Sequence, residues 1–358
     1  MTDDVAGRLH AGLVGRGAIR PTPAEILEAA RLEWPLADRI TIDRLARDVE
    51  HRFDLLGPLA GLVGDEICEV IIDGPGVVRV ERQGRIELTD VVVSKAQLDS
   101  LVERLLGPSG RRADQRSPIA DARLPDGSRL NVVVPPIAVD GPYVTIRRFP
   151  TDWPPLDAFG PPPVVDLLRR VVASRHNVVV SGATGAGKTS LLRALLEGTA
   201  RDERVITLED AVELQIPGAV RLEARPPSVE GVPAITLRDL VRTALRMRPD
   251  RLVVGEVRGG EAIELVQALN TGHDGSVATV HANGPVDAIG RLAVLCLMAD
   301  AALSVEVVER EIHRAIDVVV HVVRAPEGAR RVDALVKVGA DLTTAPLVAG
   351  GVVLDGAG

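Results

Sequence analysis

Lysine, aromatic residues and cysteine are all scarce in this chain of 358 residues. Lysine occurs only at Lys95, Lys188 and Lys337 among 42 basic residues, so arginine is the background cation of the sequence. Three Phe, two Trp and one Tyr provide few rings on which nucleic-acid bases could stack. The net charge of −8 and the lack of any polybasic block also argue against a nucleic-acid partner.

The two cysteines, Cys68 and Cys296, are far apart in the chain, and neither belongs to a CxxC pair. They imply neither a disulfide framework nor a cysteine-based zinc site, and a reducing cytosol is their natural compartment. The first residues are acidic where a signal peptide needs basic ones. The longest charge-free run, 342–354, contains one proline and two glycines and is too short to cross a bilayer. We therefore expect a cytoplasmic protein that reaches a membrane only through partners.

The chain is long enough for two domains, because single hydrophobic cores rarely grow beyond about 250 to 300 residues. Residues 1–55 have the pattern of short amphipathic helices, and residues 56–149 contain strand-like segments and one helix, which predicts a small α+β domain. Residues 150–163, PTDWPPLDAFGPPP, are rich in proline, which fixes φ. We predict a semi-rigid linker without regular structure there, followed by a second domain over residues 164–358.

Predicted strands and helices alternate in this second domain. Such alternation is typical of an α/β fold with a largely parallel sheet that is covered by helices. The predicted helices span 164–174, 188–197, 237–248 and 261–270, and the predicted strands span 177–181, 204–208, 251–257 and 276–281. The residues after about 325 predict a β-hairpin and a tail, to which the sequence assigns no role.

The segment NVVVSGATGAGKTSLLRALL contains a glycine-rich phosphate loop. Its residues Gly182, Gly185, Gly187, Lys188 and Thr189 satisfy GxxxxGK[ST], and the loop lies between an apolar strand and a leucine-rich helix. Backbone N–H groups of such a loop surround an anion, Lys188 reaches the β- and γ-phosphates, and the Thr189 hydroxyl can ligate Mg²⁺. The predicted nucleotide-binding residues are Gly182, Ala183, Thr184, Gly185, Ala186, Gly187, Lys188, Thr189 and Ser190. The loop does not identify the reaction, because kinases, GTPases, helicases and motor ATPases share it.

Two predicted strands downstream of the loop end in carboxylates. One runs into Glu209 and Asp210, with Glu213 further on, and the strand that begins at Arg251 runs into Glu256. Because the carboxyl ends of parallel strands meet at one edge of a sheet, these acids should lie beside the phosphate loop. Phosphoryl transfer requires a carboxylate that organises Mg²⁺ and a group that orients the attacking water.

Four segments, in order, resemble the motifs of the secretion ATPases, the hexameric motors of type II secretion, type IV pilus and type IV secretion machines. After the phosphate loop, ITLEDAVELQI is similar to the Asp box, LRMRPDRLVVGEVRGGEA to the Walker B segment and TGHDGSVATVHAN to the His box. Together with RLEARPPSVEG, they most resemble the Tad/Flp pilus-assembly branch. The resemblance covers about residues 55–325. It implies a RecA-like P-loop ATPase domain, preceded by the smaller α+β domain and the helical N-terminal segment.

The resemblance also implies roles for the carboxylates. The ligands of Mg²⁺ would be Thr189 and, as the Walker B acid, Glu256, partly through water. Glu209 would orient the attacking water or act as the general base, with Asp210 and Glu213 in support.

The His-box segment contains two histidines, His273 and His281. Together with one aspartate they are too few for a zinc site, which needs three or four ligands. His273 should lie in the loop after a helix, whereas His281 closes a strand and should share the carboxyl edge with Glu256. Either imidazole could simply satisfy a buried carbonyl. The resemblance implies instead that a histidine of this segment, His281 in the first place and His273 in the second, contacts the nucleotide phosphates and couples them to subunit movement.

Arginine recurs in the first domain at positions 111, 112, 116, 123, 129, 147 and 148. Solvation accounts for most of these in an arginine-rich chain, but DARLPDGSRLNV resembles the family segment whose arginines reach the γ-phosphate. Arg123 and Arg129 match that segment, and a guanidinium suits the charge of a transferring phosphoryl group. If these arginines close on the phosphate loop, the linker 150–163 has a mechanical role. ATP would then draw the two domains together, and hydrolysis would release them.

The leading interpretation is a Mg²⁺-dependent, homohexameric ATPase that powers pilus assembly or protein secretion. It would act with an inner-membrane platform protein, at the inner face of the cell membrane, and without zinc. The alternative is a RecA-like nucleic-acid translocase or conjugal DNA-transfer motor, which would favour a basic channel or stacking aromatics. A small-molecule kinase would not need the arginine-bearing first domain, and a non-catalytic scaffold would not need intact Lys188, Thr189, Glu209 and Glu256. The four-cysteine zinc module of many type II secretion ATPases is absent from the sequence.

Overall fold

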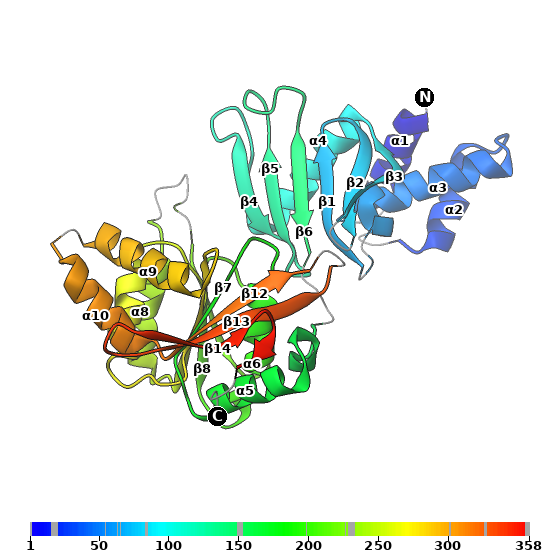
Figure 1. The fold of residues 1–358 in the computed structure, drawn as a ribbon. Helices are drawn as coiled ribbons and strands as arrows, with labels where there is room; N and C mark the ends of the chain where they lie inside the picture. The colour runs from blue at the N-terminus through cyan, green and yellow to red at the C-terminus, as the bar shows by residue number, and fades with distance from the viewer. Residues whose placement is uncertain are drawn as a thin grey trace. The chain divides into compact units, whose positions relative to one another are not determined.

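The computed structural model in Figure 1 divides into two compact units, Met1–Asp152 and Trp153–Gly358. The division falls inside the proline-rich segment 150–163, whose first three residues lie outside the described part of the chain. The structure describes residues 2–15, 21–53, 55–62, 64, 66–82, 85–148, 153–197, 199–225, 227, 233–300, 302–325 and 328–354.

The first unit begins with three helices that share a small core of their own. These are α1 (Thr2–Gly15), α2 (Pro23–Glu33) and α3 (Arg39–Phe53). Thr22 and Glu25 form a capping box at the start of α2, in which each side chain accepts a hydrogen bond from the other residue's backbone N–H. Ile26, Leu45 and Val49 are buried between the helices, so the amphipathic pattern of the sequence is used to join them.

The remainder of the first unit is a six-stranded antiparallel sheet in the order β3-β2-β1-β6-β5-β4. Its strands are β1 (Ile67–Asp73), β2 (Gly76–Arg82), β3 (Arg85–Val93), β4 (Ile119–Arg123), β5 (Arg129–Val133) and β6 (Tyr143–Arg147). The helix α4 (Lys95–Leu106) buries Leu98, Leu101 and Leu105 in one core with alternate strand residues such as Val70 and Val144. Because side chains alternate along a strand, the residues between these core positions lie on the opposite face of the sheet.

The second unit contains a nine-stranded sheet in the order β15-β14-β13-β12-β7-β11-β10-β8-β9. Six strands are parallel: β7 (Val178–Gly182), β8 (Val205–Glu209), β9 (Val220–Glu223), β10 (Arg251–Val257), β11 (Val277–His281) and β12 (Val318–Arg324). Three antiparallel strands extend the sheet, β13 (Arg330–Val338), β14 (Thr344–Ala349) and β15 (Val352–Val353). The strand β7, which leads into the phosphate loop, therefore lies between β11 and β12.

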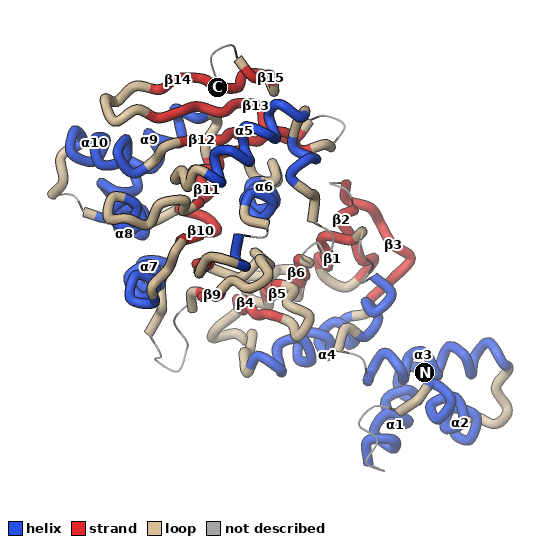
Figure 2. The backbone as a smooth tube through the Cα atoms, turned by 90° about the horizontal axis from the view of Figure 1, so that it is seen from below, coloured by secondary structure: helices blue, strands red, loops and turns tan. Residues whose placement is uncertain are grey.

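Helices cover both faces of this sheet (Figures 1 and 2). The helices α7 (Leu237–Ala244), α8 (Glu261–Leu269), α9 (Pro285–Ala299) and α10 (Val305–Ala315) pack in one core, and α5 (Pro162–Ala173) and α6 (Lys188–Leu195) pack in the other. Alternation along β7 supplies both cores, because Val179 is in the first and Val178 and Val180 are in the second. This three-layer arrangement is the predicted α/β fold.

Several predicted boundaries differ from the structure. The proline-rich segment is not free of regular structure, because it contains a 3₁₀ helix, Leu156–Phe159, and α5 begins at Pro162, where a first-turn proline has no N–H to satisfy. The predicted helix 237–248 ends as an α-helix at Ala244 and continues as a 3₁₀ turn, Leu245–Met247. The predicted C-terminal β-hairpin is present as the antiparallel pair β13 and β14, which with β15 extends the main sheet. The Gln-Gly sequence at 83–84 predicts a hairpin turn between β2 and β3, but these two residues lie outside the described part of the chain.

Candidate functional site

The phosphate loop connects the end of β7 to the first residue of α6, and close packing explains two of its glycines. Gly182 has φ of +158°, and a Cβ atom there would lie 2.5 Å from the carbonyl oxygen of Val322 on β12. Gly187 has φ of +99°, and a Cβ atom there would lie 2.5 Å from Cδ of Arg330 on β13. These positions accept only glycine without displacement of their neighbours, both because of φ and because of the space.

Lys188, at the start of α6, is folded onto its own loop. Its Nζ donates hydrogen bonds to the carbonyl oxygens of Gly182, at 3.1 Å, and Ala183, at 3.0 Å. Burial lowers the pKa of Lys188 from its ordinary value, and the carboxylate of Glu256 opposes that shift. The carbonyl contacts hold the ammonium group at the mouth of the loop, where a phosphate would replace them as its partner.

His281 joins the phosphate loop to the acid of β10. Its Nε2 is hydrogen-bonded to Oγ1 of Thr184 at 2.7 Å, and its Nδ1 is hydrogen-bonded to Oε1 of Glu256 at 2.6 Å. Nζ of Lys188 lies 3.4 Å from each ring nitrogen. The predicted proximity of His281, Glu256 and the loop is thus present within one unit, because β7, β10 and β11 are parallel neighbours whose carboxyl ends share one edge.

Arg258 is a residue of this cluster that sequence reasoning missed. Its guanidinium contacts Oε2 of Glu256 at 2.9 Å and Oδ2 of Asp210 at 3.1 Å, and so connects the ends of β10 and β8. Burial acts to raise the pKa of Glu256, but the hydrogen bond from His281 and the charges of Arg258, His281 and Lys188 outweigh it and hold that pKa below its ordinary value. The one local signal that could have indicated Arg258 is its position two residues after Glu256, directly beyond the end of β10.

Glu209 is buried at the end of β8, with 3% of its surface exposed. Its Oε1 accepts hydrogen bonds from the backbone N–H groups of Glu213, at 2.9 Å, and Leu214, at 3.0 Å. The side chain also packs against Gly255 of β10, where a Cβ atom would lie 2.8 Å from Cγ of Glu209. Glu209 therefore shapes the turn that follows β8, in addition to any role toward water.

His273 is separated from the phosphate loop, contrary to its predicted nucleotide contact. It lies in the loop after α8, at the amino end of β11, and its Nδ1 is 3.0 Å from the carbonyl oxygen of Ala268. A strand carries its two ends to opposite edges of the sheet, so only His281 reaches the edge of the loop. We therefore leave His273 out of the nucleotide site.

The oxygen donors near the loop suit Mg²⁺, which prefers hydroxyl, carboxylate and water oxygens. Thr189 follows Lys188 in the first turn of α6, and Glu256 faces the same cluster as an ionised carboxylate with a depressed pKa. Among the described residues, no group of three or more His, Cys, Asp or Glu side chains could hold a metal ion by itself. A magnesium ion at this edge would thus depend on nucleotide and water oxygens as well.

In the first unit, Arg123 and Arg129 are directly opposite each other on β4 and β5. The next strand adds Arg147, which is opposite Arg129 on β6, so three arginines form one row across the face of the sheet opposite α4. Nε of Arg147 lies 3.9 Å from Oε1 of Glu69 at the end of this row. Three neighbouring guanidinium groups, each permanently charged, make the row a suitable contact for an anion.

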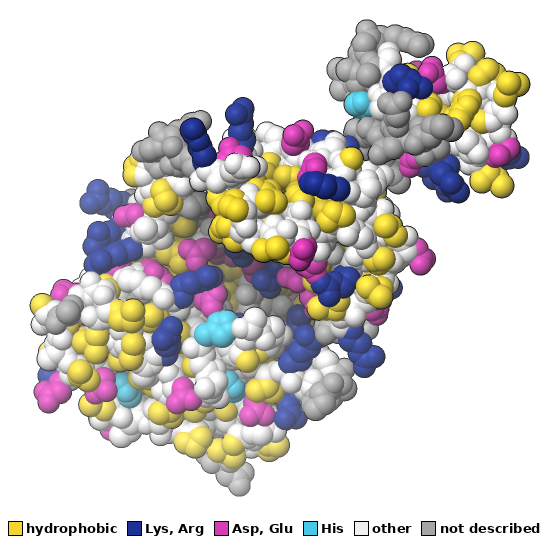
Figure 3. Space-filling model, turned by 90° about the horizontal axis from the view of Figure 1, so that it is seen from above, with side chains coloured by type: hydrophobic (Ala, Val, Ile, Leu, Met, Phe, Trp, Pro, Cys, Tyr) yellow, Lys and Arg dark blue, Asp and Glu magenta, His cyan; other side chains and the backbone are white. Residues whose placement is uncertain are grey.

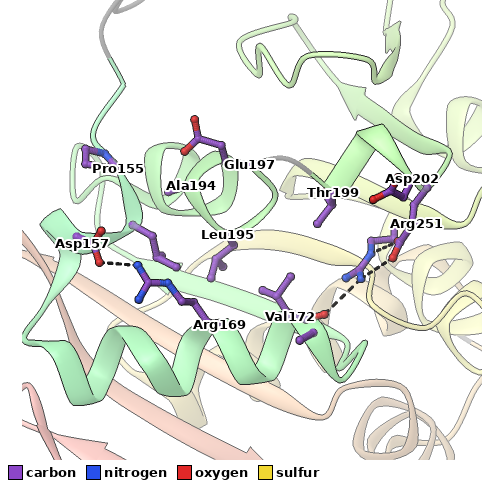
Figure 4. Close-up of a pocket in the computed structure, with 13 residues that line it drawn as sticks. Pro155, Asp157, Arg169, Val172, Ala194, Leu195, Glu197, Thr199, Asp202 and Arg251 are labelled. Carbon is purple, nitrogen blue, oxygen red and sulfur yellow. Dashed lines mark hydrogen bonds and ion pairs between the residues drawn. The ribbon is translucent and has the colours of Figure 1, made fainter.

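A pocket of about 560 Å³ lies at the amino edge of the sheet in the second unit, away from the phosphate loop. Figure 4 shows that its two arginines, Arg169 and Arg251, already contact pocket residues. Arg169 donates to Asp157 at 2.7 Å, and Arg251 pairs with Glu203 and donates to the carbonyl oxygen of Val172 at 3.3 Å. These contacts fasten the 3₁₀ helix, α5 and the start of β10 together.

Among the described residues, no helix is both long and apolar enough to span a membrane.

Comparison with known proteins gives a consistent result. The model of the family described as type II/IV secretion system protein matches residues 54–344. A putative conjugal transfer protein of Mycobacterium tuberculosis is 37% identical over 295 residues, which cover 77% of this chain and 82% of that protein. The type IV secretion system protein PtlH of Bordetella pertussis is 31% identical over 299 residues, covering 74% of this chain and 88% of that protein.

Solved structures with the same fold include the ATPase DotB of Legionella pneumophila. It has a TM-score of 0.57 and 22% identity, and the match covers 78% of this chain and 79% of that one. This likeness supports the fold, in which a RecA-like domain follows a smaller α+β domain.

Proposed function

The chain belongs to the family of type II/IV secretion system proteins and is an ATPase, and we propose that it is the hexameric motor of a pilus-assembly or secretion machine. The observation that supports the chemistry best is the joint placement of the phosphate loop, Glu256 and His281 at one edge of the sheet. Phosphoryl transfer to water needs a loop that binds the phosphates and a carboxylate that organises Mg²⁺, and His281 adds an imidazole that contacts both.

The residues of the phosphate loop and of the neighbouring strand ends would act on the nucleotide in different ways. Lys188 exchanges its two carbonyl partners for the β- and γ-phosphates, and the loop N–H groups bind the phosphate oxygens. His281 contacts the γ-phosphate from the same side as Glu256. Glu209 orients the attacking water or accepts its proton, with Asp210 and Glu213 in support.

Thr189 and Glu256 would hold Mg²⁺ with the nucleotide. The ion would supply positive charge to the phosphate oxygens as the bond to the γ-phosphate breaks. Arg258 and His281 keep Glu256 ionised and oriented before the nucleotide enters, so the acid is ready for a cation.

Movement would come from closure of the first unit on the nucleotide. Arg123 and Arg129, and with them Arg147, would contact the γ-phosphate and stabilise the charge on the transferring group. The segment 150–163 would act as the hinge. Six copies in a ring would let closure in one subunit displace its neighbours, which converts hydrolysis into directed force.

The machine would be of the Tad/Flp pilus-assembly type, as the segments 221–231 and 245–283 resemble that branch. The motor would then act at the inner face of the cell membrane on a platform protein. The reason for the second component is physical, because a motor needs a fixed base against which its subunits can push.

A second candidate is a conjugal DNA-transfer motor. It is favoured by the 37% identity to a putative conjugal transfer protein. Against direct DNA contact, acidic and basic side chains are interspersed on the face shown in Figure 3, and the net charge is −8. DNA would therefore have to be engaged by other components of such a machine.

The test is steady-state ATP hydrolysis as a function of protein concentration, with and without DNA. We expect specific activity to rise steeply with concentration, to ignore DNA, and to vanish in Glu256→Gln and Lys188→Ala. Lys337→Ala is the matched control, because Lys337 is exposed on β13 and should leave activity unchanged. Activity that is independent of concentration would contradict the hexamer, and stimulation by DNA would favour the second candidate. Full activity in Lys188→Ala would overturn the nucleotide site.

A further inference from the structure

Arg330 lies against the phosphate loop, although it comes from the C-terminal strands to which the sequence assigned no role. Its Nη1 donates a hydrogen bond to Oγ of Ser190 at 2.9 Å. The aliphatic part of its side chain packs against Gly187, so closely that a Cβ atom at Gly187 would lie only 2.5 Å from Cδ of Arg330. Arg330 thus reaches the first turn of α6, whose N–H groups bind phosphate in a loop of this kind.

The sheet order puts Arg330 on the opposite side of the loop from Glu256 and His281. The strand β7 has β11 and then β10 on one side, and β12 and then β13 on the other. Glu256 and His281 come from the first pair of strands, and Arg330 begins β13 in the second. In the proposed function the γ-phosphate lies on the β11 side, beside Glu256 and His281, so the nucleoside end of the phosphate chain would lie toward β12.

We propose that Arg330 is a nucleotide-binding residue that contacts the α-phosphate of ADP and ATP. This inference rests on the proposed function, since it assumes that the loop binds a nucleoside phosphate. Arginine suits the contact because its guanidinium is always charged and carries several N–H donors, so it can keep the bond to Ser190 and donate to a phosphate oxygen. The glycine at 187 leaves room for its stem.

A contact to the α-phosphate has a signature that differs from that of a γ-phosphate contact. The α-phosphate is present in ADP and ATP and does not take part in bond breaking, so its loss should weaken both nucleotides alike and leave the chemical step unchanged. Arg123 and Arg129 should instead affect turnover.

The experiment measures ADP and ATP binding by calorimetry, and kcat at saturating ATP, in the full chain. Arg330→Ala, and Arg330→Gln, which keeps most of the stem, should each weaken both nucleotides about 10-fold or more, as loss of a charged hydrogen bond does. The value of kcat should stay within about two-fold of the unaltered chain. Arg331→Ala is the matched control, because Arg331 pairs with Asp333 at 3.2 Å on the strand surface, and it should bind normally.

A second measurement separates direct contact from support of the loop. ADP with sulfur in place of one α-phosphate oxygen, tested as separate stereoisomers, should bind the unaltered chain more weakly in one form, and Arg330→Gln should lose that discrimination. Equal ADP affinity in Arg330→Gln and the unaltered chain would overturn the inference, as would an unchanged sulfur effect. Failure of the unaltered chain to bind ADP and ATP would contradict the proposed function itself.

Discussion

Nδ1 of His281 lies 2.6 Å from Oε1 of Glu256, and this contact joins two neighbouring parallel strands at the edge where the phosphate loop begins. The other ring nitrogen of His281 is bound to Thr184 in the loop. One imidazole therefore links the two segments that would hold the phosphates and the metal. We therefore expect a nucleotide that displaces either Thr184 or Glu256 from the imidazole to shift His281 relative to its remaining partner.

The role of His281 can be tested by comparison with the second histidine of the same segment. His281→Asn should lower kcat for ATP hydrolysis about 100-fold, as loss of one group that stabilises transition-state charge commonly does. His273→Asn should leave kcat nearly unchanged, because His273 lies at the other edge of the sheet and contacts Ala268. Steady-state kinetics of ATP hydrolysis should be measured for both variants. Equal losses of kcat would show that the position of a histidine at one or the other edge of the sheet does not decide its contribution to turnover.

The arginine row of the first unit should affect rate more than affinity. Arg129→Ala, at the centre of the row, and Arg123→Ala should lower kcat about 100-fold while ATP affinity changes only a few-fold, since the contact forms fully in the transition state. Arg112→Ala is the matched control, because Arg112 is exposed outside the strands of this sheet. Turnover and direct ATP binding should be measured together. Normal turnover in Arg129→Ala would mean that the arginines of this row are solvated surface residues without a role in hydrolysis.

Glu256 should make stability depend on pH in the acidic range. Its folded pKa is below the ordinary value of 4.5, so its ionised form stabilises the folded state, fully above about pH 4.5 and less as pH falls through the folded pKa. Glu256→Gln lacks this contribution. The difference in free energy of unfolding between the two proteins, from urea titrations between about pH 7 and pH 3, should therefore shift in favour of the variant as pH falls. A difference that shifts the opposite way would mean that burial dominates the pKa of Glu256.

The packing of Gly182 predicts a stability effect that does not need a nucleotide. Gly182→Ala should destabilise the chain by about 1 to 3 kcal/mol, because its Cβ would overlap the backbone oxygen of Val322. Gly290→Ala is the contrasting variant, since Gly290 is exposed in α9 with no atom near its Cβ position, and it should stabilise by about 0.5 to 1 kcal/mol. Thermal unfolding gives both values, and destabilisation by Gly290→Ala would show that an unseen contact covers α9.

Much of the site was predictable because its signals are local. A phosphate loop needs a short run of residues in a fixed order. An apolar run followed by a carboxylate indicates a strand that ends in an acid. Lys188, Glu209 and Glu256 could therefore be named from the sequence, together with the edge of the sheet at which they meet. The boundaries of the eight helices and strands that were predicted between 164 and 281 lie within a few residues of the structure, except where the helix after Leu237 tightens into a 3₁₀ turn. The elements β9, α9, α10 and β12 of the second unit were not predicted.

The sequence by itself determined that this chain has a phosphate loop, carboxylates at the ends of parallel strands and two units joined near a proline-rich segment. Only the tertiary structure decided that His281 bridges Thr184 and Glu256, that Arg258 joins Glu256 to Asp210, and that Arg330 returns from the last strands to Ser190. The reason is that strand order and register are set by contacts between residues far apart in the chain. No local pattern records which distant side chain will come to lie beside a given atom.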